Sequence, residues 1–287
     1  MSGRVVTTKT NAPIAGARVE SFIASATTDS DGRFTLTAQN GPSGNLGITV
    51  SADGHRPRET VIGFPRTGDP QIDLMSTAPP FDEKFFNQLV RDATRTPDAL
   101  RPSFRWASEL KFYVRTVDET LRVAAPEVLA TVRQGIVDAV REFTGGQYQA
   151  VIEEGTEVRP ERVGWVNVEL LQEIPEGDYC GLATNVGGNP STLKLRIDRC
   201  GCGSIKIPAD VVIHEVGHAL GLFHVEGDDD LMAPGYFSNC RATLPTAREV
   251  YHAQLMYQRP RANRDPDRDP SGFTLSVGRF PGAPGLP

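Results

Sequence analysis

The chain has 287 residues, a formal net charge of −6 and 39% hydrophobic residues. Its length fits two globular domains, and its acidic balance argues against a nucleic-acid partner. No segment approaches the roughly 20 consecutive apolar residues that a membrane-spanning helix needs.

Residues 1–76 have the composition of a small all-β domain. They contain no cysteine and are rich in Thr, Val, Gly and Asp. Asp31 and Gly32 precede the alternating segment 33–36, a pattern that is typical of a β-hairpin. Further short strands are predicted at residues 3–6, 13–19, 46–51 and 59–62.

These segments resemble the carboxypeptidase regulatory-like, or transthyretin-like, β-sandwich. The resemblance rests on G-x-V at Gly3, P-(I/L)-x-G-A-x-V at Pro13 and T-x-x-D-G-x-F at Thr28. It implies a module without chemistry of its own that serves as a spacer, an adhesion unit or a folding partner. The module is therefore a candidate for binding a surface or another protein.

Residues 77–81 form a short linker, which Pro79 and Pro80 stiffen. The domain that we place at 82–260 has both helices and strands. Alternation at 110–115 predicts a strand, and a helix is predicted to start at Pro126 and to end at Gly145. Other helices are predicted at 81–95, 211–220 and 245–258, and other strands at 148–152, 165–171, 181–184 and 193–197.

Three of the five histidines fall within the eleven residues 214–224, which read H-E-x-x-H-x-x-G-x-x-H. His214 and His218 are four residues apart, so on a helix both imidazoles reach one metal ion. Gly221 ends the helix and turns the chain, so that His224 returns as a third ligand. Three protein ligands leave one tetrahedral position for water, which is typical of a catalytic zinc.

Glu215 lies beside the first ligand and is the predicted catalytic residue. Its carboxylate can take a proton from the zinc-bound water and pass it to the leaving amine. The pattern therefore predicts hydrolysis of peptide bonds. Two other interpretations are a pair of buried core histidines, and a site in which Glu249 replaces His224 as third ligand.

The chain resembles the metzincins, and among them the matrixin-type metallopeptidases. Met232 follows His224 by eight residues and begins an M-x-P-x-Y pattern with Pro234 and Tyr236. The resemblance implies an α+β zincin-like domain with a mixed twisted sheet, an active-site helix, a Met-turn and a C-terminal helix. It also implies that Met232 supports the ligands and that Pro234 and Tyr236 line the substrate pocket.

The resemblance places the family's edge strand at residues 181–185. Leu182 and Ala183 would then bind an extended substrate as an added strand; a plain surface strand is the alternative. The chain also departs from the family, because Val225 and then Glu226 follow the third histidine where matrixins usually have Ser. The segment 199–201 superficially resembles their latency cysteine, but its position inside the catalytic region indicates a structural role.

All four cysteines, Cys180, Cys200, Cys202 and Cys240, lie in the catalytic part. Four cysteines allow three pairings, and two disulfides would suit an exported enzyme. Free thiols and a second zinc site are the alternatives. No signal peptide is visible, so a secreted protein would have lost it; cytoplasmic residence is the other possibility.

The sequence thus predicts a secreted, monomeric zinc endopeptidase that acts on proteins or peptides. The alternative interpretations are a non-catalytic adhesion protein on the same scaffold and a zinc aminopeptidase. Residues 228–230 are three aspartates that are candidate calcium ligands or a solvated acidic turn. Residues 261–287 are predicted to be an extended or disordered tail, with 273–277 as a candidate strand. The two remaining histidines carry no comparable metal signal: His55 lies in the β module, and His252, on the last helix, is predicted to be structural.

Overall fold

A computed structural model describes residues 1–37, 44–65, 68–106, 109–187, 191–198, 200, 206–227, 229–235 and 244–275. The N-terminal domain is all-β. Its seven strands are β1 Ser2–Thr7, β2 Arg18–Glu20, β3 Ser25–Thr27, β4 Arg33–Thr35, β5 Gly44–Ser51, β6 Arg58–Phe64 and β7 Gln71–Leu74. They form two sheets, ordered β4-β1-β7 and β3-β2-β5-β6, whose apolar side chains share one core.

The turn at Asp31 and Gly32 does not form the hairpin that the sequence predicts. The strands on either side of it belong to different sheets, because β3 pairs with β2 while β4 pairs with β1. Thr28 fixes the crossing: its hydroxyl donates to Ile14 O at 2.6 Å and accepts the Ala17 N–H at 2.8 Å. The prediction of a turn holds, and the predicted pairing across it is wrong.

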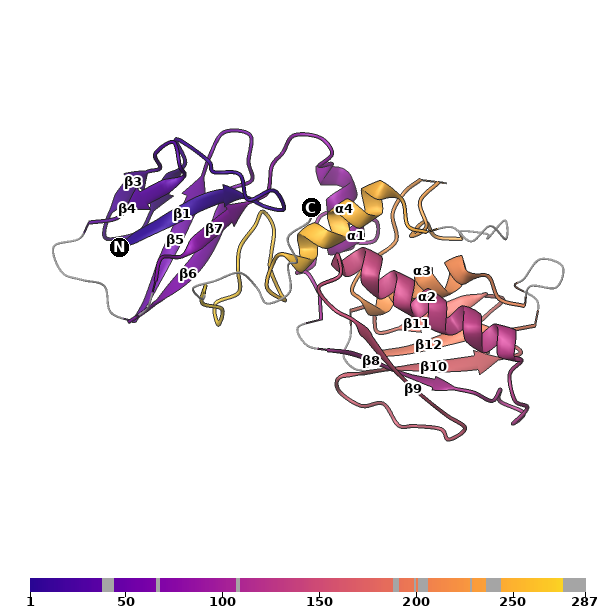
Figure 1. Cartoon of the computed structure of the whole chain (residues 1–287). Coiled ribbons are helices and arrows are strands. Elements are labelled where there is room, and N and C mark those ends of the chain that lie inside the picture. The colour runs from indigo at the N-terminus through magenta and orange to yellow at the C-terminus, as the bar shows by residue number, and fades with distance from the viewer. Residues whose placement is uncertain are drawn as a thin grey trace.

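The second domain mixes helices with one five-stranded sheet. Its strands are β8 Leu110–Arg115, β9 Ala150–Gly155, β10 Trp165–Leu171, β11 Gly181–Thr184 and β12 Ser191–Arg196. The order is β11-β12-β10-β8-β9, and only the pairing of β11 with β12 is antiparallel. Helices α1 Glu83–Arg91, α2 Pro126–Thr144, α3 Ala209–Ala219 and α4 Ala247–Tyr257 complete the domain (Figure 1).

Capping residues explain where these helices begin and end. Pro126 starts α2, and Gly145 ends it with φ 64° in the left-handed region, as predicted. Helix α1 is shorter than predicted because the Asp82 side chain caps its first turn and Asp92 adopts φ 58° at its end. Thr246 and the third helical residue form a capping box at the start of α4.

The chain that follows α4 returns to the N-terminal domain and runs along β6. Asp269 N–H donates to Glu59 O at 2.9 Å, and Leu275 N–H donates to Val61 O at 2.7 Å. Figure 1 shows this segment, in yellow, beside β6. The described part of the predicted tail, 261–275, therefore consists of turns and isolated bridges and packs against a sheet. The last two residues of the candidate strand 273–277 lie outside the described residues.

Buried ion pairs fix this returning segment to β6. Arg58 and Asp269 pair at 2.8 Å with neither side chain exposed. Arg259 pairs with Asp267 at 2.9 Å, with exposures of 1% and 0%. Asp73 of β7 accepts hydrogen bonds from both arginines. Because charges removed from water are tolerated only when paired, these contacts require the two domains to stay together.

The same network reaches helix α1. The Asn263 amide donates to Asp267 at 2.8 Å and to Asp269 at 3.1 Å. Arg91, on α1, donates to the backbone carbonyl of Asn263 at 3.0 Å and to its side-chain oxygen at 2.9 Å. The chain after α4 therefore binds the N-terminal sheet on one side and the second domain on the other.

We expect Arg259→Met to destabilise the protein by about 3–5 kcal/mol, because it leaves buried carboxylates without their cation. Denaturant unfolding measures the loss. Arg18→Met is the matched control, since Arg18 is 65% exposed in its pair with Glu20, and should change stability by less than about 0.5 kcal/mol. Similar losses in the two variants would contradict the importance of the network.

The network also predicts a response to acid. Burial alone would raise the pKa of Asp73, but Arg259 and Arg58 hold that pKa well below its usual value. A carboxylate whose pKa is lowered by folding stabilises the fold fully above its unfolded pKa of about 4 and loses this contribution as the pH falls further. In unfolding series at decreasing pH, the stability difference between the wild type and Asp73→Asn should shrink below about pH 4. A difference that stays constant down to about pH 2.5 would contradict this.

Candidate metal centre

Helix α3 carries two of the three histidines of the motif on one side. His214 and His218 are one turn apart, and the apolar side chains of Val212, Ile213 and Val216 bury the rest of the helix in the core. The two imidazole rings meet edge to face with centroids 4.7 Å apart. The local sequence thus produces a rigid pair of nitrogen donors.

Backbone carbonyls orient both rings. Nδ1 of His214 lies 2.6 Å from Leu231 O, and Nδ1 of His218 lies 2.8 Å from Leu222 O. A carbonyl can only accept a hydrogen bond, so Nδ1 carries the proton in each ring. Nε2 is then left with its lone pair, which is the form that binds a metal.

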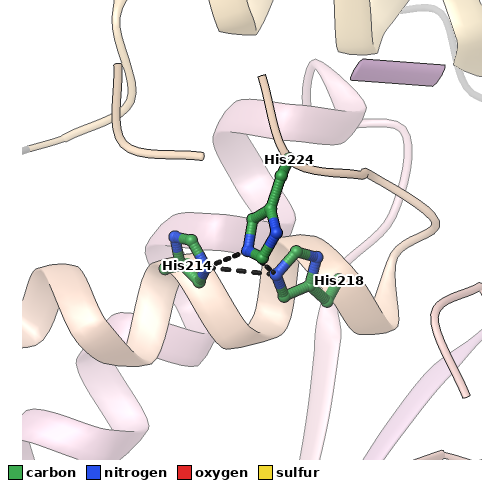
Figure 2. Close-up of side chains that lie close together, drawn as sticks. All are labelled: His214, His218 and His224. Atoms are coloured by element: carbon green, nitrogen blue, oxygen red, sulfur yellow. Dashed lines mark hydrogen bonds between the residues drawn. The ribbon is translucent and has the colours of Figure 1, made fainter. Parts of the chain in front are cut away.

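His224 completes a triangle of nitrogen atoms. Its Nε2 lies 3.1 Å from that of His218 and 3.3 Å from that of His214, and the other two are 3.0 Å apart. Figure 2 shows His224 reaching over from the chain beyond α3 so that the three rings converge. Three nitrogens at tetrahedral positions around a zinc ion are about 3.3 Å apart, given Zn–N bonds of about 2.0–2.1 Å. The residues present therefore fit such an ion.

The surroundings keep the three imidazoles neutral. Burial lowers the pKa of His214, and burial with the neighbouring histidines lowers the pKa of His218 well below its usual value. Burial also lowers the pKa of His224 to about 4. Neutral imidazole is the metal-binding form. Within the described ranges, these histidines are the one group of three or more His, Cys, Asp or Glu that could share a metal ion.

The turn after α3 depends on Gly221. Its φ of 100° lies in the left-handed region, and a Cβ at this position would come within 2.4 Å of Phe104 O. The free carbonyls at the end of the helix are bound by side chains from elsewhere. Trp106 Nε1 donates to Ala219 O at 2.7 Å, and the Tyr257 hydroxyl donates to Leu220 O at 3.0 Å. The sequence motif at 214–224 does not predict these two donors, which come from distant parts of the chain.

Met232 is fully buried and packs against helix α3. A Cβ added to Gly217 of α3 would stand 2.7 Å from the Met232 sulfur, so the sulfur packs against the helix backbone. Glu249 accepts the Met232 N–H at 2.6 Å and the Thr246 N–H at 2.7 Å. The alternative in which Glu249 is the third ligand is wrong, because its carboxylate accepts the N–H groups of Met232 and Thr246 and is not part of the histidine cluster.

Glu215 is 6% exposed and faces the edge strand β11. Burial raises the pKa of Glu215 to about 8, although a hydrogen bond from the Ala183 N–H acts in the opposite direction. Leu182 and Ala183 are partly exposed on that strand, and Pro234 is exposed. Tyr236 lies outside the described residues, so its predicted place in a pocket stays a prediction.

One disulfide joins Cys180 to Cys200, with Cα atoms 5.4 Å apart. It links the start of β11 to the chain between β12 and α3, which agrees with a structural role for Cys200. Cys202 and Cys240 lie outside the described residues.

The calcium interpretation of the aspartates finds no support at Asp230. Its carboxylate is bound by the Thr246 hydroxyl, at 3.0 Å, and by Arg248. Asp228 lies outside the described residues.

The two remaining histidines lie outside the cluster of three, and His252 has the structural contacts that were expected of it. His252 is fully buried and accepts the Asp82 N–H at 2.9 Å, which ties α4 to the start of α1. His55 lies near Thr7 in the N-terminal domain, with 3.3 Å between Nε2 and the hydroxyl. No helix in the described part of the chain is long and apolar enough to span a bilayer.

Two family models match parts of the chain. The model described as a carboxypeptidase regulatory-like domain matches residues 1–74, and the model described as matrixin matches residues 205–258. The three histidines lie inside the matrixin match. So do Glu215 and Met232. This match to a peptidase family supports zinc metallopeptidase-like function, and no curated protein matches the chain significantly.

Three solved structures show weak similarity to this chain. A GM1-bound form of the ECX AB5 holotoxin has 11% identity and a TM-score of 0.37, and the alignment covers 57% of this chain and 85% of that one. Two mutants of a type II cohesin–X-dockerin complex from Acetivibrio cellulolyticus have 31% and 25% identity, with TM-scores of 0.19 and 0.20. The alignments cover 27% and 30% of this chain, and 53% and 65% of those chains. No functional conclusion rests on these structures.

We expect Gly221→Ala to destabilise the protein by about 2–4 kcal/mol, because left-handed strain and overlap with Phe104 act together. Zinc affinity should fall as well, since His224 follows this turn. Gly16→Ala is the matched control: Gly16 has φ 73° but nothing within 4 Å of an added Cβ, so it should lose only about 1–2 kcal/mol. Denaturant unfolding and zinc titration check both, and equal losses would contradict the role of the contact.

Proposed function

We propose that this protein is a zinc-dependent endopeptidase with a zincin-like catalytic domain. The observation that carries the proposal is the convergence of three neutral imidazole nitrogens within 3.0–3.3 Å of one another, next to the buried carboxyl group of Glu215. The matrixin match over the same residues supports it independently.

The three histidines would hold the metal. His214 and His218 are fixed by their hydrogen bonds to Leu231 O and Leu222 O, and His224 is fixed by the turn at Gly221. A zinc ion bound there would acidify a water molecule and polarise the carbonyl of the scissile bond. Met232 would support the ligand histidines from beneath.

Glu215 would act as general base and then as general acid. One carboxylate oxygen would take a proton from the attacking water and deliver it to the nitrogen of the leaving amine as the C–N bond breaks. A bound divalent cation favours the ionised carboxylate, so the proton-accepting form would be present despite burial. The Ala183 N–H, which binds this carboxyl group, would hold it in place between the two transfers.

Strand β11 would bind the substrate. It is the last strand of its sheet and pairs only with β12 in the described structure. An extended peptide would add to this edge through main-chain hydrogen bonds at Leu182 and Ala183, with Pro234 and Tyr236 lining a side-chain pocket. A chain bound along an edge extends past the cleaved bond in both directions, which suits cleavage within a peptide.

The disulfide supports a location outside the cytoplasm. Disulfides persist in oxidising compartments and are rare in the cytosol, and Cys180 and Cys200 are joined. We propose that the protein is secreted and acts as a monomer on proteins or peptides. The N-terminal domain would serve as a folding partner of the peptidase or bind a surface or another protein.

We expect Glu215→Ala to retain zinc and to lose about 100- to 10,000-fold in kcat on a peptide blocked at both ends, because the proton carrier is missing. Internal fluorescence quenching in that peptide measures cleavage, and elemental analysis measures zinc. Glu109→Ala, at a glutamate with a 58% exposed side chain, should leave both unchanged.

Equal activity of the Glu215 variant and the wild type would refute the role of Glu215. Cleavage only of peptides with a free N-terminus would indicate the aminopeptidase, and zinc binding without cleavage would favour the adhesion protein.

A further inference from the structure

The first residue of β11, Gly181, lies against the side chain of Glu215. A Cβ at position 181 would stand 2.5 Å from both Cγ and Oε1 of Glu215 and 2.7 Å from its Cδ. These separations are far below contact distance for two carbon atoms, which is about 3.5–4.0 Å. The space that any other residue would fill at position 181 is occupied by the carboxyl-bearing side chain.

Glycine is required here because a side chain would overlap with Glu215, and not because of the backbone conformation. Gly181 is absent from the glycines with positive φ. It pairs as an ordinary strand residue with Leu195 of β12. An alanine would therefore suit the backbone at this position, and the three heavy atoms nearest to its methyl group would all belong to Glu215.

Strand β11 is held so that it cannot move away from such a methyl group. The disulfide from Cys180 fixes the residue just before Gly181. The carbonyl of Cys180 also accepts the Arg196 N–H at 3.0 Å. At the other end, the Ser191 hydroxyl donates to Thr184 O at 2.7 Å. A larger residue at position 181 would therefore displace the side chain of Glu215.

The Glu215 side chain has little room to respond without losing its place. It is 6% exposed, and it starts from the core helix α3 between the two ligand histidines. Because Cγ itself is one of the atoms in conflict, rotating only the carboxyl group would not relieve the overlap. The side chain would have to change rotamer and leave the Ala183 N–H that binds it.

We propose that Gly181 is a positioning residue for Glu215. Because residue 181 has no side chain and its strand is fixed at both ends, it leaves a space that holds the Glu215 carboxyl group beside the metal centre. This inference rests on the proposed function, in which Glu215 moves the proton. It adds a specific constraint, namely that the strand that would bind the substrate also sets the position of the general base.

The test is a double-mutant cycle between positions 181 and 215. We expect Gly181→Ala to lower kcat by about 100-fold, the loss that a misplacement of about 1 Å can cause, with zinc content unchanged. In the Glu215→Ala background the same substitution should change kcat by less than about twofold, because no carboxyl group is left to displace. Gly47→Ala, in β5 with nothing within 4 Å of the added Cβ, is the matched control and should match the wild type.

Melting temperatures give a second readout that does not depend on peptidase activity. Gly181→Ala should lower the melting temperature of the wild type by several degrees and have little effect on Glu215→Ala. This holds even when no peptide is cleaved by any variant, a result that would refute the proposed function but not the contact. Should Gly181→Ala fail to fold, folding of the double variant would support the proposal.

Three outcomes would overturn the inference. The first is a Gly181→Ala enzyme with wild-type kcat. The second is a loss of kcat or of melting temperature that is as large in the Glu215→Ala background as in the wild type. The third is failure of both the single and the double variant to fold, which would place the constraint in the strand backbone and not in Glu215.

Discussion

The reversal of the chain at Gly221 is the constraint on which the candidate metal centre depends. The left-handed turn places Leu222 where its carbonyl orients His218, and it carries His224 back across the end of α3. The turn itself is held from outside the motif, because it packs against the backbone of Phe104 and because Trp106 and Tyr257 bind the helix carbonyls just before it. Eleven consecutive residues therefore form a site only inside a complete domain.

Two groups of buried polar side chains, the histidine cluster and the ion pairs between the domains, tolerate removal from water in different ways. In the metal centre, burial keeps the imidazoles uncharged, so that their lone pairs stay free for a cation. At the junction between the domains the groups remain charged, and Arg58 and Arg259 are surrounded by aspartates. The first arrangement could take up a cation, whereas the charges of the second are paired within the chain and hold the two domains together.

Local patterns in the sequence predicted the local features well. The histidine spacing, the start of α2 at Pro126 and its end at Gly145 each follow from residues within one or two helical turns. The pairing of the strands beside Asp31 and Gly32 was predicted wrongly, because a turn signal does not specify which sheet receives the next strand. The hydrogen bond from the Met232 N–H to Glu249 was missed for a similar reason, because it joins segments that are distant in sequence.

The glycines illustrate the same limit. Gly221 was recognised because a glycine after a helix has a known conformational meaning. Gly181 gave no such signal, since its backbone is ordinary and its importance comes from a side chain more than thirty residues away. A residue that functions through the volume it leaves empty can be identified only once its neighbours are known.

The segment that returns from α4 to β6 changes how the two halves of this chain relate to each other. The two family matches end at residues 74 and 258, as if a regulatory-like module had simply been placed before a peptidase. Yet the aspartates that pair with Arg58 are residues 73 and 269, which lie on opposite sides of the second domain in the sequence. During evolution, a different N-terminal module could replace this one only if it carried an arginine at the same place, or if the chain after residue 258 changed with it.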